Sequence, residues 1–215
     1  MDIKDEIFKY ENLFYLSCHP SRLGKVLAQN ELYKKIINIP GEIVELGVFK
    51  GASLSRFAML RNIYEQNSSR EIIGFDTFAE FPENKNDDDK YFTKLHNKID
   101  KSIDIDSFYK NLDERGLREG IDLVKGNIVE TVPAYLKKRP SLKISLLNLD
   151  TDVYEPAAVT LEKLYPRVCK GGVVIIDNYA KVPGETKAID EYFENLDIQI
   201  NKFPYSSTPC YFIKQ

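Results

Sequence analysis

SLKISLLNLDTDVYEPAAVTLEKLYPRVCKGGVVIIDN (residues 141–178) carries the clearest indication of the fold in this sequence. An apolar run that ends in Asp150 is followed by a helix-like segment over residues 157–168 and by a second apolar run over residues 171–178. Strands that alternate with helices in this way pack into a parallel sheet that is covered on both faces. The stretch therefore predicts an α/β protein.

The same alternation continues on both sides of this stretch. Further strands are predicted over residues 42–49, 71–76 and 121–126, and further helices over residues 53–66, 129–139 and 185–196. Two short strands at the end, over residues 197–203 and 210–215, are joined by a short polar turn and can only pair antiparallel.

The N-terminal region has a different character. Residues 1–40 show helical apolar spacing, which His19-Pro20-Ser21 interrupts, so Ser21 is expected to cap a second helix. We therefore expect an N-terminal helical segment at residues 1–40, acting as a lid or a dimer contact, and one domain at residues 41–215. A homodimer is the assembly that this segment suggests.

Composition narrows the class of protein. Of 215 residues, 43% are hydrophobic and 29% are charged, with a net charge of −3, so a disordered chain is excluded and a nucleic-acid coat is disfavoured. Cys18, Cys169 and Cys210 lack the spacing of a zinc site or a disulfide framework. The chain has no spanning apolar run and no signal-type N-terminus, so we expect a cytoplasmic protein with neither a nucleic-acid nor a membrane partner.

Polar side chains close four of the predicted strands, at Glu45, Asp76, Asp150 and Asp177-Asn178. Ligands of an open parallel sheet bind at the carboxyl ends of its strands, so these groups should surround one crevice. An acid at the position of Asp76 can accept hydrogen bonds from both hydroxyls of a ribose. Asn127, after the third strand, is either a second adenosine contact or a turn residue.

The glycines after the first strand lie four residues apart. Gly47 allows a sharp turn out of the strand, and Gly51 allows close approach of a ligand or a helix. The third glycine of a dinucleotide fingerprint is missing, and so is the lysine-serine pair of a P-loop, which disfavours both classes.

Asp150, Asp177 and Asn178 are hard oxygen donors, which suit Mg²⁺, Mn²⁺ or Ca²⁺ better than zinc. The alternative is a helix cap at Asp150 and a turn at the other two. Asp152, two residues further on, could take a proton from a hydroxyl whose pKa a bound cation has lowered.

Residues 83–106 are unusually polar and form either a solvated loop or a lid over the site. The two histidines, His19 and His96, lie away from the strand ends and are expected to be surface or structural residues. His96, within the candidate lid, is the better candidate for a substrate contact.

PGEIVELGVFKGAS, GFDTFAEFPE, LNLDTDVYEP and LYPRVCKGGVVIIDNY followed by AIDEYF resemble the macrocin O-methyltransferase family over roughly residues 10–195. Its members are metal-dependent class I enzymes that methylate sugar hydroxyls with S-adenosylmethionine. The resemblance implies a seven-stranded Rossmann-like sheet, parallel except for a reversed last strand. It also implies that the cofactor contacts Glu45, Gly47, Gly51, Ser53 and Asp76, that magnesium (or manganese) is held by Asp150, Asp177 and Asn178, and that Asp152 is the general base.

The chain departs from the family at Asn178, where members usually carry a second acid. The aspartate-asparagine pair is similar to that of catechol-type O-methyltransferases, but those enzymes place a lysine base where this chain has Val153. The resulting hypothesis is a magnesium-assisted, S-adenosylmethionine-dependent O-methyltransferase that acts on a hydroxyl of a sugar or a sugar-bearing small molecule. The alternatives are a catechol-like or other small acceptor, or a nucleotide-binding module without chemistry.

Overall fold

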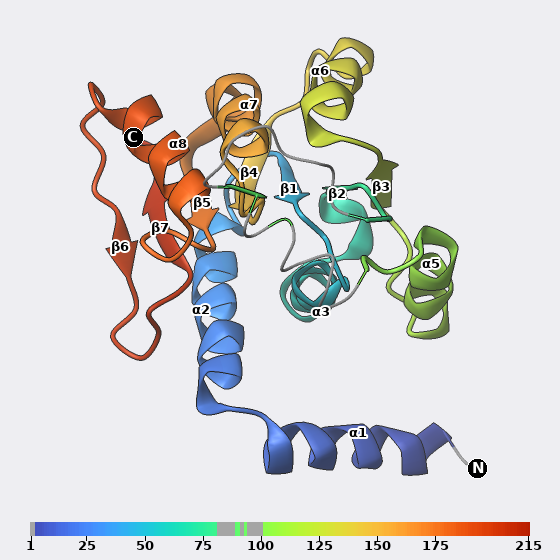
Figure 1. Cartoon of the computed structure of the whole chain (residues 1–215). Helices are drawn as coiled ribbons and strands as arrows, with labels where there is room; N and C mark the ends of the chain where they lie inside the picture. The colour runs from blue at the N-terminus through green and yellow to red at the C-terminus, as the bar shows by residue number, and fades with distance from the viewer. Residues whose placement is uncertain (1–2, 81–88, 91–92, 94–100) are drawn as a thin grey trace.

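The computed structural model describes residues 3–80, 89–90, 93 and 101–215. Their strands form one sheet of seven in the order β3-β2-β1-β4-β5-β7-β6 (Figure 1). Strands β1 to β5 pair parallel, whereas β7 pairs antiparallel with both β5 and β6, which confirms the predicted mixed sheet with a reversed end. The strands are β1 Glu42–Leu46, β2 Ile72–Asp76, β3 Ile121–Lys125, β4 Ile144–Leu149, β5 Val168–Ile176, β6 Asn201–Lys202 and β7 Cys210–Ile213.

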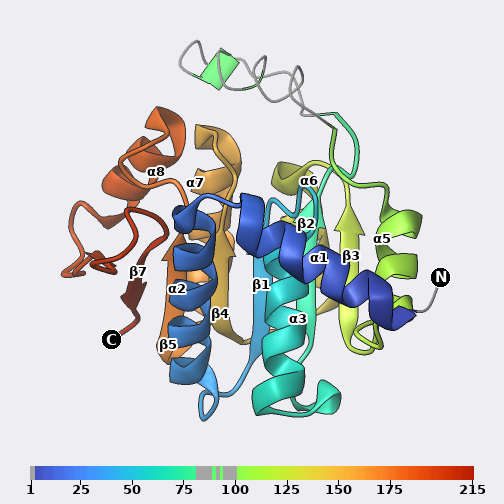
Figure 2. The ribbon, with the colours of Figure 1, turned by 90° about the horizontal axis from the view of Figure 1, so that it is seen from below.

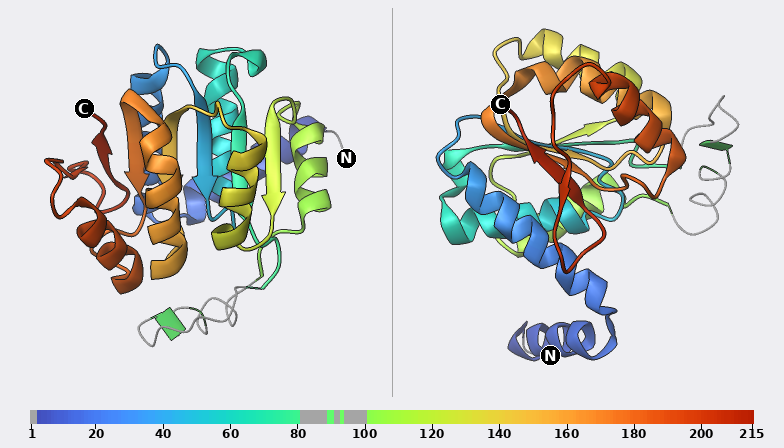
Figure 3. Two further views of the ribbon diagram at one scale, coloured as in Figure 1. Left: turned by 90° about the horizontal axis from the view of Figure 1, so that it is seen from above. Right: turned by 90° about the vertical axis from the view of Figure 1, so that its left-hand side faces the viewer.

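Helices cover both faces of this sheet, as the two views in Figure 3 show. One layer holds α6, α7 and α8, and the opposite layer holds α2, α3 and α5 (Figure 2). Helix α1 lies apart from both layers and meets α2 at a bend (Figure 1). The helices are α1 Ile3–Ser17, α2 Pro20–Ile36, α3 Ala52–Tyr64, α5 Ile105–Glu114, α6 Ile128–Lys138, α7 Tyr154–Leu164 and α8 Pro183–Phe193, with short 3-10 turns at Asn67–Ser69 and Tyr165–Arg167.

The central strands explain why the sheet needs two helical layers. Every residue of β4 is buried, as is the run Val173–Ile176 of β5, so both faces of these strands carry apolar side chains that require a cover. Helix α2 supplies part of that cover through Leu32, Tyr33 and Ile36, which belong to the same apolar cluster as Ile43 of β1 and Val173 of β5. The division at residue 40 stays a prediction, because no feature of the described chain tests it.

Three local expectations were incomplete or wrong. Helix α5 was missed, although its apolar residues follow helical spacing and bury Phe108 and Leu112. The cap of α2 is His19 rather than Ser21: the His19 ring nitrogen Nδ1 accepts from the Ser21 backbone N–H at 3.3 Å. Strand β5 starts at Val168, three residues before Gly171, because a register irregularity opposite β4 accommodates the two glycines within the strand.

Within the described ranges, no helix combines the length and the apolar character needed to cross a lipid bilayer.

Candidate functional site

A cavity of about 370 Å³ opens at the carboxyl ends of the parallel strands. Its lining comes from the end of β2, from the residues that directly follow β1, β4 and β5, and from helices α2 and α3, as expected for an open α/β sheet. Its lining includes six of the predicted site residues, which are Gly47, Ser53, Asp76, Asp150, Asp177 and Asn178, and also the predicted base Asp152.

Gly47 is required by the crossing of two chain segments. Its φ is +90°, and a Cβ built on it would lie 1.9 Å from the carbonyl oxygen of Asp150. The backbone N–H of Asp150 in turn donates to the carbonyl of Leu46 at 3.0 Å. The end of β1 and the end of β4 can therefore come together only if residue 47 has no side chain.

Gly51 serves packing rather than the cavity. It precedes α3 with a φ of +76°, and a Cβ there would lie 2.4 Å from the ring of Phe108 on α5. The sequence allowed Gly51 to serve the close approach of either a ligand or a helix, and the structure shows the close approach of helix α5. A cofactor contact at Gly51 stays a prediction.

Glu45 lies behind the cavity wall. Its side chain is buried, and its Oε1 accepts a hydrogen bond from the hydroxyl of Ser53, which does line the cavity. Burial raises the pKa of Glu45 to about 8. The carboxylate therefore reaches the cavity through Ser53 in this structure, and its direct contact with a cofactor stays a prediction.

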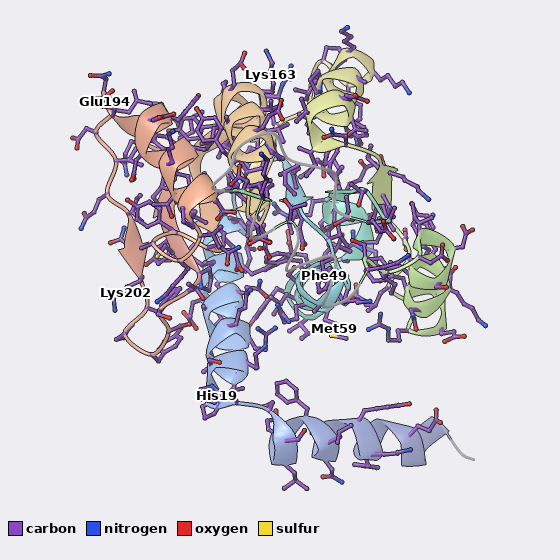
Figure 4. The ribbon with its side chains drawn as sticks, viewed as in Figure 1. His19, Phe49, Met59, Lys163, Glu194 and Lys202 are labelled. Atoms are coloured by element: carbon purple, nitrogen blue, oxygen red, sulfur yellow. The ribbon has the colours of Figure 1, made fainter. Side chains whose placement is uncertain are left out.

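Asp76 lies on the cavity wall at the end of β2 and is held in place by backbone groups. Its Oδ2 accepts from the N–H of Phe49 at 2.9 Å, and its Oδ1 accepts from the N–H of Phe78 at 2.7 Å. Phe49 follows the end of β1 by three residues and is labelled near the centre of the view in Figure 4. Because each carboxylate oxygen has two lone pairs, Asp76 can accept further hydrogen bonds from a ligand.

Asn127 lies outside the cavity lining. Its side-chain oxygen accepts from the N–H of Val129 at 3.1 Å and caps the N-terminus of α6. The structure thus shows the capping role, and an adenosine contact at Asn127 stays a prediction.

The predicted metal ligands and the predicted base form one polar cluster. The side-chain nitrogen of Asn178 donates to Asp150 Oδ1 at 2.9 Å and to Asp152 Oδ1 at 2.7 Å. Asp177 Oδ2 lies 2.6 Å from Lys25 Nζ, whereas its buried Oδ1 has no hydrogen-bond partner among the described residues. Burial raises the pKa of Asp150 well above its usual value, and the nearby charge of Asp177 raises it further.

This cluster has the donor chemistry of a site for a hard cation, with one carboxylate fewer than a three-acid site. Among the described residues, no three His, Cys, Asp or Glu side chains are arranged to hold a metal ion. Asp150 and Asp177 contribute two carboxylates, and Asn178 contributes an amide whose nitrogen faces the acids. Rotating the Asn178 carboxamide by about 180° would direct its oxygen, in place of its nitrogen, towards the acids. The unpartnered Asp177 Oδ1 offers a further oxygen ligand.

Glu185, in the first turn of α8, organises this cluster from behind and was missed in the sequence. The side chain is buried; its Oε2 accepts from the N–H groups of Thr151 and Asp152, and its Oε1 accepts from the N–H of Asn178, each at 3.0 Å. Burial raises its pKa to about 8. The signal in the sequence was slight, because an acid in the first turn of a helix is ordinarily an exposed residue that favours the helix dipole.

Replacing Glu185 by glutamine should loosen both the loop after β4 and the loop after β5, because Glu185 accepts hydrogen bonds from each of them. An amide cannot accept from all three N–H groups, and each buried donor left unpaired costs about 1–3 kcal/mol. We expect the free energy of unfolding, measured by urea denaturation and circular dichroism, to fall by at least that amount. The control is Glu194→Gln at the exposed end of α8 (Figure 4), where an unchanged value is expected. Equal effects of the two substitutions would contradict this role.

The end of the polar segment at residues 83–106 reaches the cavity. Ser102 lines it, and the N–H of Ile103 donates to the carbonyl of Phe49 at 2.8 Å. His96 and most of this segment lie outside the described residues. His19 lies at the bend between α1 and α2 (Figure 4), away from this cavity, where it caps α2.

A solved structure defines the class to which this sheet and cavity belong. An apo structure of CalS11, described as a TDP-rhamnose 3'-O-methyltransferase of calicheamicin biosynthesis, matches the chain with a TM-score of 0.71 at 30% sequence identity. The match covers 94% of this chain and 84% of that chain. The fold is that of the class I methyltransferases.

The sequence then places the chain within that class. The sequence model of the Macrocin-O-methyltransferase (TylF) family matches residues 23–212, so the chain belongs to this family. It is 30% identical over 169 residues to the demethyldecarbamoylnovobiocin O-methyltransferase of Streptomyces niveus, which is 75% of this chain and 61% of the relative.

A second curated relative is the 8-demethyl-8-(2,3-dimethoxy-alpha-L-rhamnosyl)-tetracenomycin-C 4'-O-methyltransferase of Streptomyces olivaceus. It is 30% identical over 148 residues, which is 66% of this chain and 54% of that relative. The chain thus spans between half and two thirds of the length of these two relatives.

Proposed function

We propose that the protein is an S-adenosylmethionine-dependent, magnesium-assisted O-methyltransferase that acts on a hydroxyl of a sugar or a sugar-bearing small molecule. The observation that carries the proposal is the cavity at the strand ends, which is lined both by Asp76 of β2 and by the cluster of Asp150, Asp152 and Asp177. A cofactor and an acceptor must meet in one cavity for a group to pass between them.

The cofactor side of the cavity lies along β1 and β2. Asp76 would accept a hydrogen bond from the ribose hydroxyls, since backbone N–H groups hold both of its oxygens in place and Oδ2, with a single donor, keeps a free lone pair. Gly47, which has no side chain, lines the cavity with its backbone, and Ser53 lines it from the first turn of α3. The positive end of that helix favours a carboxylate such as the one on the methionine part.

The acceptor side is formed by the ends of β4 and β5. Asp152 would take the proton of the acceptor hydroxyl while the hydroxyl oxygen bonds to the methyl carbon and the bond from that carbon to the cofactor sulfur breaks. Asp150, Asp177 and Asn178 would hold Mg²⁺, which lowers the pKa of a hydroxyl when bound. Val153, where a catechol-type enzyme carries a lysine base, is 1% exposed and precedes α7, which favours Asp152 as the base.

Two observations on relatives support a sugar acceptor. CalS11 is described as a TDP-rhamnose 3'-O-methyltransferase, and the tetracenomycin relative is named for methylation at the 4' position of a rhamnosyl compound. Both sequences align with more than half of this chain at 30% identity.

Cofactor binding is tested by calorimetry with S-adenosylmethionine on the purified protein. We expect saturable binding, and we expect Asp76→Asn to weaken it roughly 10- to 100-fold because a hydrogen bond to a charged group is worth about 1.5–3 kcal/mol. Asp113→Asn, on the exposed face of α5, is the control and should bind as the unaltered protein does. Absence of binding at millimolar cofactor would contradict the proposed function.

A further inference from the structure

Lys25 of α2 makes a partly buried ion pair with Asp177, the acid that follows β5. Its Nζ lies 2.6 Å from Asp177 Oδ2, and the side chains are 15% and 6% exposed. The two residues are far apart in sequence, so only the packing of α2 against β5 brings them together. Holding a lysine in this way costs free energy, because the side chain loses rotamer freedom and hydration. The ion pair with Asp177 offsets this cost, which distinguishes it from an exposed pair on the surface.

The surroundings of this pair combine several carboxylates with the guanidinium groups of Arg22 and Arg56, which line the same cavity. Asp150 and Asp152 share the neutral amide of Asn178, and Asp177 Oδ1 is buried without a partner among the described residues. The Lys25 ammonium thus contacts the edge of this cluster, at Oδ2 of the same carboxylate whose unpartnered Oδ1 is a candidate metal ligand.

We propose that Lys25 is a built-in counter-ion, which holds Asp177 while the site is free of metal and leaves it when a divalent cation binds. The inference rests on the magnesium site of the proposed function. An ammonium and a divalent cation repel each other and compete for the same carboxylate, so both cannot stay in contact with Asp177 without a large cost. Metal binding is therefore weakened by the need to break the ion pair.

A second cavity gives the released side chain a place to go. It has a volume of about 510 Å³ and lies between the start of α2 and the turn before β7. Lys25 and Asp177 line both this cavity and the cavity of the candidate site, so the ion pair stands in their common wall. The remaining lining of the second cavity is mostly polar and offers hydroxyl groups to an ammonium, at Ser21, Ser206, Ser207 and Thr208, but it also includes the cationic Arg22.

The test is the affinity of the chelator-treated protein for Mn²⁺, read from the electron paramagnetic resonance signal of the free ion. We expect Lys25→Met to bind Mn²⁺ at least tenfold more tightly than the unaltered protein. Lys25→Arg keeps the charge and should bind as the unaltered protein does. Lys35→Met, which removes an exposed lysine of the same helix, is the matched control and should also leave the affinity unchanged.

Melting temperatures give a second readout. In chelator, Lys25→Met should melt below the unaltered protein because Asp177 has lost its counter-ion, and Mn²⁺ should raise its melting temperature by more than that of the unaltered protein. If Lys25→Met fails to fold without metal, Lys25→Gln, whose neutral amide can still donate to Asp177, takes its place in both measurements.

Unchanged or weaker Mn²⁺ binding by the neutral variants would overturn the inference while leaving the proposed function intact. If neither the unaltered protein nor the variants bind Mn²⁺, the inference falls together with the metal part of the proposed function. Calorimetry with S-adenosylmethionine on the same samples then shows whether the methyltransferase proposal itself survives.

Discussion

Asp152→Asn should lower the rate of methyl transfer by about 10²- to 10⁴-fold, the usual contribution of a general base. Asparagine has nearly the same shape as aspartate but cannot take up a proton at neutral pH. The backbone should not change, because Asp152 has a φ of +62° and asparagine is one of the few residues that tolerate that region. The backbone N–H of residue 152 would still donate to Glu185.

The measurement is steady-state turnover with a panel of nucleotide-linked deoxysugars and glycosylated small molecules, together with calorimetry for the cofactor. Cofactor affinity should stay nearly the same, since Asp152 lies on the acceptor side. Asp113→Asn again serves as the matched aspartate control, with turnover unchanged. A rate unaffected by Asp152→Asn would remove this residue from the proposed chemistry.

Gly47→Ala should have the largest effect on folding of any single methyl group added to the site. The new Cβ would lie 1.9 Å from the carbonyl oxygen of Asp150, and neither backbone can retreat without breaking the pairing of β1 with β4. A forced shift at a buried crossing belongs to the rare substitutions that cost more than about 4 kcal/mol. Cofactor binding should be lost as well, because residue 47 lines the cavity.

Gly116→Ala separates the cost of a positive φ from the cost of a steric clash with the new Cβ. Gly116 also has a positive φ, of +65°, but a Cβ there would meet no atom within 4 Å. Its substitution should therefore cost only the backbone term of about 1–2 kcal/mol. Urea denaturation gives both values, and similar losses for the two variants would mean that the close approach at Gly47 is not the constraint we describe.

The candidate site could be predicted in part because strand ends are visible in a sequence. Asp76, Asp150 and Asp177 each follow an apolar run, and parallel strands deliver their carboxyl ends to one edge. The same rule could not decide between two roles for Asn127, which follows a strand in the same way and caps α6 in this structure. The position of a residue after a strand predicts which edge of the sheet it reaches, but it does not predict the hydrogen-bond partner of the side chain.

Local apolar patterns and the family resemblance were enough to predict the strands, the helices other than α5, the reversed end of the sheet and the acids at its rim. The roles of Glu185, which supports the loops after β4 and β5, and of Lys25, which faces Asp177, became visible in the folded chain alone. Contacts of this kind join segments that are distant in the chain, and an acid or a lysine on a helix shows the same local pattern whether it faces solvent or a buried partner. Packing alone distinguishes the two, since burial is what makes an unpaired charge costly enough to require a partner.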